Sequence, residues 1–274
     1  NLSTLLWAKL HKYYEIYSID EVRAEDETDE EYQVRQLYYM ESSQENALQV
    51  AFKRANKPVE VKYNGIYVLG VLEGSPAEKV LKPGDRITSV DGHAFQSSTE
   101  FTDYIQGKQA GDAVRITVVR EGKELTEDIV LQYIEQIGKT GMGISLVDDK
   151  EVLTDPKVEF NTEDIGGPSA GLMFTLEVYN QLVEEDITKG YAIAGTGTIE
   201  ADGTVGPIGG VEQKVIAADK AGAEIFFAPN ENGDEDSDYA RAVATAKEIG
   251  TDMIIVPVDT FDDALIYLNK LKKK

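Results

Sequence analysis

The stretch GGPSAGLMFTLEVYNQLV, residues 166–183, joins a turn rich in glycine and proline to a strongly apolar run. Proline suits the first position of a helix because that position needs no main-chain N–H, and glycine lets the main chain approach a ligand closely. The stretch therefore predicts an apolar helix from about Ser169 to Val183, with a serine in its first turn.

The same first turn is a place where negative charge could be stabilised. Its free N–H groups, together with the helix dipole, would stabilise an oxyanion by about 3 kcal/mol per donor. Ser169 is then a candidate nucleophile, and the main-chain groups of Gly167, Ser169 and Ala170 are the candidate oxyanion donors. A serine that only caps the helix is the alternative interpretation of this turn.

Outward from this helix, the chain alternates between short apolar strands and amphipathic helices. Strands are expected near Val158–Phe160 and at Tyr191–Ile199, Ile225–Ala228 and Met253–Val256, and helices near Val211–Ala221, at Asp238–Ile249 and at the C-terminal end, with a hairpin turn at Asp202-Gly203. This alternation predicts an α/β or α+β domain over residues 136–274.

Two further segments precede that domain. Residues 59–135 contain short strand patterns separated by turns such as Lys82-Pro83-Gly84 and Asp91-Gly92, which predicts a small β-rich domain. Residues 1–58 have helical periodicity, and we expect a helical segment that packs on the C-terminal domain. The predicted fold class is therefore multidomain, with a β-rich part, an α/β part and an N-terminal helical segment.

Composition excludes several classes of function. The net charge of −23 repels polyphosphate, so we expect no nucleic-acid partner. The chain has no cysteine, which excludes disulfides, a thiol nucleophile and cysteine-ligated zinc. Neither His11 nor His93 has a second histidine or a spaced carboxylate beside it, and both are interpreted as surface or turn residues. A hydrolase built from this sequence must work without a Ser/His pair or a histidine-bound metal.

Three partial cofactor motifs are incomplete. Residues 138–140 end like a phosphate-binding loop but lack its upstream glycine, and residues 195–197 lack the third glycine of a dinucleotide fingerprint. Asp234, Asp236 and Asp238 match the first ligands of a calcium loop, but the loop's glycine and its bidentate glutamate are missing. We therefore expect no nucleotide, no metal and no other cofactor.

Lys214 lies on the apolar face of the predicted helix 211–221, in line with Val211 and Val215. Burial and a first-turn position both disfavour the ammonium ion and lower the pKa of Lys214. To act as a base near neutrality that pKa must fall by about three units, equivalent to about 4 kcal/mol. A neutral Lys214 would be the general base for Ser169 in peptide-bond hydrolysis. The alternative is a lysine whose stem covers apolar surface while its amine reaches water.

Together these motifs resemble the proteolytic domain of the Lon protease family. That family has, in order, a Gly-Pro-Ser-Ala-Gly nucleophile turn, a Thr-Gly strand, a Pro-Ile-Gly-Gly approach and a lysine helix that opens with Gly-Gly. The matching residues here are 167–171, 196–197, 207–210 and 209–214. The resemblance covers approximately residues 137–271 and implies a Ser169/Lys214 dyad in which Thr196 hydrogen-bonds to Lys214 and orients it.

Gly166 departs from the pattern of many Lon enzymes, which have an acidic residue directly before Gly-Pro-Ser. The Gly166-Gly167 form resembles the ATP-independent, PDZ-containing Lon-like serine proteases of bacteria, which are generally tethered by an N-terminal transmembrane helix. The resemblance implies an ATP-independent endopeptidase on the extracytoplasmic side of the cell membrane, with that tether absent from this chain. It also implies a homo-oligomer, such as a ring, that acts on protein or peptide substrates.

Residues 59–135 are similar to bacterial PDZ modules of protease chains. The similarity rests on residues 63–68, on the motifs GSPA at 74–77 and LKPGD at 81–85, and on the VDG turn at 90–92. It implies that Gly65, Ile66, Tyr67 and Val68 bind a peptide as an added strand. A β domain that only spaces or gates the protease is the alternative for this module. For the whole chain, the alternative is a non-catalytic PDZ scaffold whose protease-like domain binds unfolded segments.

Overall fold

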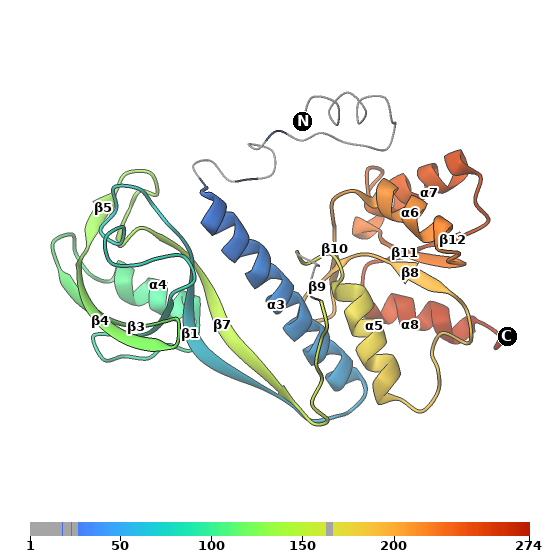
Figure 1. The fold of residues 1–274 in the computed structure, drawn as a ribbon, viewed down its shortest axis with the longest axis horizontal. Helices are drawn as coiled ribbons and strands as arrows, with labels where there is room; N and C mark the ends of the chain where they lie inside the picture. The colour runs from blue at the N-terminus through green and yellow to red at the C-terminus, as the bar shows by residue number, and fades with distance from the viewer. Residues whose placement is uncertain (1–17, 19–22, 24–26, 163–166) are drawn as a thin grey trace. The chain divides into compact units, whose positions relative to one another are not determined.

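The computed structural model describes residues 18, 23, 27–162 and 167–274, which divide into two compact units (Figure 1). Among the described residues, unit 1 contains 18, 36–60, 154–162 and 167–274, and unit 2 contains 23, 27–35 and 61–153. His11, Gly166 and most of the first part of the predicted segment 1–58 lie outside the described residues.

Unit 2 is a β-rich domain built on a five-stranded sheet in the order β4-β3-β2-β1-β7. The strands of the unit are β1 (Val59–Val71), β2 (Arg86–Val90), β3 (Ala113–Arg120), β4 (Lys123–Val130) and β7 (Ile144–Thr154), with a separate pair formed by β5 (Gln132–Ile134) and β6 (Lys139–Gly141). Val114, Ile116 and Val118 recur at every second position of β3 and share a buried core with Phe101 of helix α4 (Ser98–Gln106). This period of two is the pattern of a strand with one buried face, and the predicted β-rich domain is confirmed.

The boundary between the units lies later in the chain than the predicted one. β7 is a hydrogen-bonded neighbour of β1, so residues 144–153 belong to unit 2. The predicted boundary at 135/136 assigned them to the C-terminal domain. A strand that pairs with a segment far away in sequence carries no local signal of its partner, and for this reason the turn before β7 looked like a domain boundary.

Helix α3 (Asp29–Arg54) contributes residues to both units. Residues 29–35 belong to unit 2, whereas residues 36–54 belong to unit 1. Ala47 and Val50 from the second part are buried in a core of unit 1. Residues 36–54 are therefore an integral part of unit 1, although most of that unit lies much later in the sequence.

Unit 1 is an α/β domain around a parallel three-stranded sheet in the order β12-β11-β8 (Figure 1). Its elements are α5 (Gly171–Leu182), β8 (Ile193–Gly195), β9 (Thr198–Ile199), β10 (Val205–Gly206), α6 (Val211–Lys220), β11 (Ile225–Pro229), the short 3₁₀ helix η1 (Glu231–Gly233), α7 (Asp238–Ile249), β12 (Ile254–Val258) and α8 (Phe261–Lys270). The predicted α/β class of this domain is confirmed.

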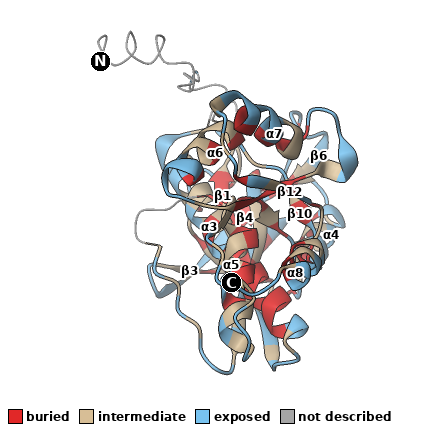
Figure 2. Ribbon diagram, turned by 90° about the vertical axis from the view of Figure 1, so that its right-hand side faces the viewer, coloured by how far each residue is buried: buried red, intermediate tan, exposed pale blue. Residues whose placement is uncertain are grey.

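The two faces of this sheet are covered by different helices. Ile225 and Phe227 of β11 share one core with α3, α5 and α8, and Phe226 and Ala228 share the other with α6 and α7. Successive side chains of a strand point to opposite faces, so a single buried strand supplies both cores. The buried sides of α5 and α8 can be followed in Figure 2.

One predicted strand is absent. Residues 155–162 contain neither helix nor strand, although a strand was expected near Val158–Phe160. Phe160 is held instead by an edge-on ring contact with Phe174 of α5, at 5.2 Å between ring centroids. Within the described part of the chain, no helix has both the length and the apolar character needed to cross a membrane.

Candidate active site

Ser169 lies on the turn that leads into α5. The helix begins at Gly171, with Ala170 as its N-cap, two residues later than predicted. Ser169 O accepts a hydrogen bond from Gly197 N at 3.0 Å, which ties the residue before the N-cap to the segment after β8. Gly167 has a left-handed φ of 80°, which favours glycine. Ser169 therefore stands on a constrained turn before the helix instead of inside its first turn.

Lys214 is brought to this turn by α6. The helix starts after Gly210, whose φ of 69° and ψ of 42° are left-handed, and it buries Val211 and Val215. Lys214 lies on the same side as these two residues and is half-buried. Its Nζ donates a hydrogen bond to Ser169 Oγ at 3.2 Å, so the two residues that the motifs singled out are in direct contact.

Two opposing effects act on the amine of Lys214. Burial is the larger and lowers the pKa of Lys214, because a charged amine loses hydration there, while the negative charge of Asp238 raises it. The net direction is downward. A lysine with a lowered pKa is neutral in a larger fraction of molecules near neutral pH, and only a neutral amine can accept the proton of a serine hydroxyl.

The hydroxyl of Thr196 is hydrogen-bonded to the turn at residues 167–170, here called the serine turn, and within the described residues it has no hydrogen bond to Lys214. Thr196 follows the last residue of β8 and is buried, and its Oγ1 donates to Ser169 O at 3.0 Å. Its own N–H donates to Phe227 O at 3.0 Å. The family resemblance predicts that this hydroxyl orients Lys214. The structure instead places it behind the nucleophile, on the carbonyl that Gly197 N also contacts.

The candidate oxyanion donors lie on the same turn. Within the described residues, the main-chain N–H groups of Ser169 and Ala170 take part in no hydrogen bond. Unpaired N–H groups are normal at the start of a helix, where no preceding turn supplies acceptors. Both groups are therefore free to bind an external acceptor. Gly167 precedes them, and a Cβ at its position would lie 3.2 Å from Gln36 Oε1.

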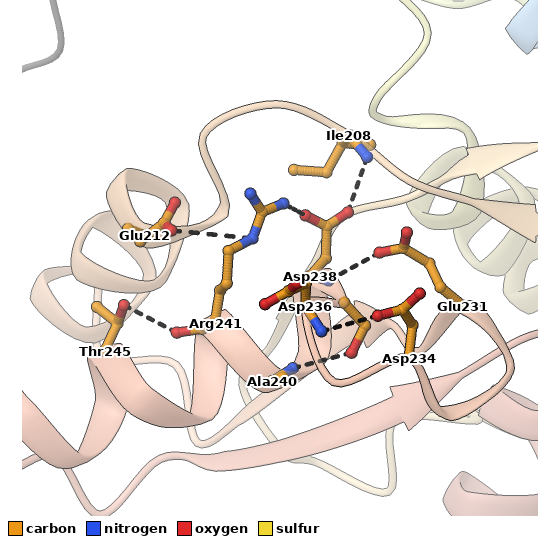
Figure 3. A network of polar contacts seen from close by, with 10 residues as sticks. Ile208, Glu212, Glu231, Asp234, Asp236, Asp238, Ala240, Arg241 and Thr245 are labelled. Carbon is orange, nitrogen blue, oxygen red and sulfur yellow. Dashed lines mark hydrogen bonds and ion pairs between the residues drawn. The ribbon is translucent and has the colours of Figure 1, made fainter.

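A buried carboxylate holds the segment that leads into α6 (Figure 3). Asp238 Oδ2 accepts a hydrogen bond from Ile208 N at 2.8 Å, and Oδ1 is paired with the guanidinium of Arg241. Arg241 also approaches Glu212 of α6, with 3.9 Å between Nε and Oε1. The network ties the start of α7 to the start of α6, and through α6 it positions Lys214.

Sequence reasoning considered Asp238 only as a ligand of an incomplete calcium loop. In the structure its carboxylate accepts a hydrogen bond from Ile208 N and forms an ion pair with Arg241. Asp234 Oδ1 accepts a hydrogen bond from Asp236 N at 2.9 Å. The local signal for the ion pair was the spacing of three residues between Asp238 and Arg241 on one helix. Among the described residues, no group of three or more His, Cys, Asp or Glu side chains could hold a metal ion.

The four candidate peptide-binding residues lie in the interior of the sheet of unit 2. Gly65–Val68 are part of β1, whose neighbours are β2 on one side and β7 on the other. Val68 N donates to Asp85 O at 2.9 Å, and Val68 O accepts from Gly84 N at 2.8 Å. Gly65 has a φ of 142°, and a Cβ there would lie 2.4 Å from Ile87 O. β1 is thus not an edge strand of this sheet.

His93 is exposed on the turn after β2, with its ring 5.4 Å from that of Tyr104. Of the candidates drawn from the sequence, the structure therefore brings together Ser169, Lys214 and Thr196 with the free N–H groups of Ser169 and Ala170. These groups stand at the carboxyl end of β8, where Thr196 and Gly197 leave the parallel sheet.

Comparison with known families identifies two domains in the chain. Residues 162–269 match the Lon protease (S16) C-terminal proteolytic domain, and residues 50–131 match the PDZ domain. The Lon protease of Campylobacter concisus is 39% identical over 227 residues, which are 71% of this chain and 25% of that protein. The Lon protease of Mycoplasmopsis agalactiae is 30% identical over 212 residues, which are 75% of this chain and 20% of that protein.

Among solved structures, the PDZ domain of an SdrC-like protein from Listeria monocytogenes is 46% identical. The match covers 32% of this chain and 93% of that one, with a TM-score of 0.31. The chain spans a quarter or less of the length of the two Lon relatives. It is a Lon-like chain that combines a PDZ domain with a Lon-type C-terminal proteolytic domain.

Proposed function

We propose that this protein is an ATP-independent serine endopeptidase in which Ser169 is the nucleophile and Lys214 the general base. The contact between Lys214 Nζ and Ser169 Oγ, at 3.2 Å, is the observation that carries the proposal. A nucleophilic hydroxyl needs a base within hydrogen-bond reach, and a lysine with a lowered pKa can be that base. The match to a Lon-type proteolytic domain supports protein or peptide substrates.

The proposed reaction proceeds through an acyl-enzyme. Neutral Lys214 accepts the Oγ proton as Ser169 attacks the carbonyl carbon, and the N–H groups of Ser169 and Ala170 bind the oxyanion. The ammonium of Lys214 then protonates the leaving amine as the C–N bond breaks. Lys214 next takes a proton from a water molecule that attacks the ester. It returns that proton to Ser169 Oγ as the ester C–O bond breaks, which releases the carboxyl product and restores Ser169 and neutral Lys214.

Digestion of a loosely folded protein tests the proposal. Wild type should degrade fluorescein-labelled casein without added nucleotide, and ATP should not change the rate. Ser169→Ala and Lys214→Gln should each lower the rate by at least about a thousandfold, because neither variant can form the activated nucleophile. Lys220→Gln, on the exposed last turn of the same helix, is the matched control and should retain the wild-type rate.

Two outcomes would overturn the proposal: equal degradation by wild type and Ser169→Ala, or no degradation by either across several substrates and pH values. Oligomeric state should be measured by light scattering on the same samples. By resemblance to Lon-type domains we propose a homo-oligomer, and an active monomer would contradict that part.

The location of the protein is a separate proposal, supported by the resemblance to tethered Lon-like proteases with a PDZ domain. We propose that it acts on the extracytoplasmic side of the bacterial membrane. Protease added to intact cells should then digest it, while a cytoplasmic marker should survive. Protection equal to that of the marker would refute this location.

The match of residues 50–131 to the PDZ domain also favours a second candidate, a non-catalytic scaffold that binds unfolded segments. Both candidates use a PDZ domain to bind peptides, so binding alone cannot separate them. A serine-directed fluorophosphonate probe can. Labelling of wild type but not of Ser169→Ala favours the peptidase, and equal labelling of both favours the scaffold.

A further inference from the structure

Two peptide units meet at Ser169, and the carbonyl oxygen of each accepts hydrogen bonds from other parts of unit 1. The unit between Ser169 and Ala170 accepts hydrogen bonds from Thr196 Oγ1 and Gly197 N, both at 3.0 Å. The unit between Pro168 and Ser169 accepts one from Gly171 N at 3.2 Å. These two units carry the two free N–H groups that we assign to the oxyanion.

The second unit has another partner from a distant part of the chain. Ser43 Oγ, on α3, donates a hydrogen bond to Pro168 O at 3.2 Å. Ser43 is 3% exposed, so few competing water molecules can reach this hydroxyl. The residue lies outside both of the ranges that match known families, 50–131 and 162–269.

The geometry of the amide links Ser43 to the reaction centre. The peptide unit is planar and normally trans, so the C=O of Pro168 and the N–H of Ser169 point in opposite directions in one plane. A hydrogen bond that fixes the carbonyl therefore also fixes the direction of the N–H. It also polarises the amide, which strengthens the N–H as a donor.

The surroundings of Ser43 give it little freedom to move. A Cβ at Gly171 would lie 2.8 Å from Ser43 Oγ, which shows how closely α3 approaches the start of α5. One turn later, Asn46 Nδ2 donates to Ile199 O at 3.0 Å, and Ala47 and Val50 are buried beside Leu172. α3 is thus hydrogen-bonded to both the serine turn and β9.

We propose that Ser43 is a positioning residue of the peptidase, which aims the N–H of Ser169 at the oxyanion. This inference rests on the proposed function. It assigns to α3, most of which precedes the range that matches the PDZ domain, a part in transition-state stabilisation. Thr196 has the equivalent place behind the N–H of Ala170, so the two donors are set by two different elements.

The test is Ser43→Ala in the full chain, with Ser75→Ala as the matched control. Ser75 Oγ also donates to a distant main-chain oxygen, that of Gly143 at 3.3 Å, but in unit 2. Ser43→Ala should lower kcat about tenfold with little change in KM, below the roughly hundredfold that a displacement of about 1 Å can cost. It should also weaken the binding of a peptide aldehyde inhibitor, whose adduct with the serine mimics the tetrahedral intermediate, by a similar factor. Ser75→Ala should change neither.

Hydrogen exchange gives a second measurement that needs no catalysis. Ser43→Ala should accelerate exchange in a peptide covering residues 167–172 relative to wild type, whereas Ser75→Ala should not. If Ser43→Ala left kcat unchanged, or raised only KM, the inference would be overturned even in an active enzyme. Unchanged exchange would overturn it even if the wild type hydrolysed nothing, an outcome that would refute the proposed function separately.

Discussion

Lys214 carries the group whose protonation decides whether the proposed reaction can begin. Burial lowers its pKa, and the charge of Asp238 acts in the opposite direction. Because the neutral amine is the active form, kcat/KM should rise with pH through this pKa. Asp238→Asn removes the charge that favours the ammonium ion, lowers the pKa of Lys214 further, and should move the rising limb of the profile to lower pH.

Glu224→Gln is the control for this shift. It also removes one negative charge from unit 1, but from a half-buried residue paired with Lys274. Its profile should match that of wild type. A rising limb that moves to higher pH in Asp238→Asn would contradict the electrostatic assignment.

Gly171 is the residue at which the serine turn has least room. A Cβ there would lie 2.7 Å from Ile199 Cγ2 and 2.9 Å from Ile199 N, and a main-chain atom cannot easily move away. Gly171→Ala should therefore destabilise unit 1 by about 1–3 kcal/mol and lower activity. Denaturant unfolding and casein digestion measure the two effects.

Gly209→Ala is the comparison for Gly171→Ala, because no atom lies within 4 Å of a Cβ at Gly209 and its φ is not left-handed. It should be close to wild type in both assays. Equal losses in the two variants would mean that crowding at Gly171 is not the cause.

The pairing of Ser169 with Lys214 could be predicted at the residue scale, but the contacts that hold the turn around Ser169 could not. Ser169 and Lys214 each carry a local signature, a glycine-rich turn and a polar residue on an apolar helix face. Ser43 has no such signature. It is one of several polar residues in an amphipathic helix, and its partner, Pro168 O, is far away in the sequence. The partner of Thr196 was mispredicted for the same reason.

At the scale of elements, β7 has a direct consequence for peptide binding. A peptide can add to a strand only where the strand has a free edge, and β1 has a bonded neighbour on each side. Binding at Gly65–Val68 should therefore require β7 to leave. Asp149→Ala, which breaks the ion pair between β7 and Arg86 of β2, should raise the affinity for a fluorescent peptide with an apolar C-terminus about tenfold.

Asp128→Ala is the corresponding control, because it breaks the pair with Arg115 between β3 and β4, which does not involve β1. Peptide affinity is measured by fluorescence polarisation for wild type, Asp149→Ala and Asp128→Ala, and only Asp149→Ala should bind more tightly than wild type. Wild-type affinity as high as that of Asp149→Ala would show that β7 does not compete with the peptide.

Elements with strong local patterns were predicted well. α6 and α7 begin where the sequence placed them, since Gly210 and Ser237 precede amphipathic runs. The strand expected near Val158–Phe160 is absent, because a β-type pattern needs a partner strand and Phe160 finds an aromatic partner instead. The strand was mispredicted because strand formation depends on contacts with residues far away in the sequence.

At the scale of the whole molecule, the net charge of −23 affects the capture of substrates. An acidic protein attracts cationic chains over distances comparable to the Debye length, about 10 Å at 0.1 M salt and about 3 Å at 1 M. Unfolded, alkylated proteins with net positive charge should therefore be cleaved with a higher kcat/KM at low salt than anionic ones of similar length. The difference should shrink as NaCl approaches 1 M, and a difference that does not depend on salt would contradict this origin.

The order of the two units along the chain also has a consequence for synthesis. The residues of unit 2 between 61 and 153 are made after α3 and before the remainder of unit 1, which begins at residue 154. Domains fold during translation as soon as their residues are available. Ala47 and Val50 then join a core whose other members start at Leu172, and Ser43 binds Pro168 O, so all three find their partners only in residues made after unit 2. A nascent chain that ends before residue 168 therefore lacks both the partner of Ser43 and the turn that carries Ser169.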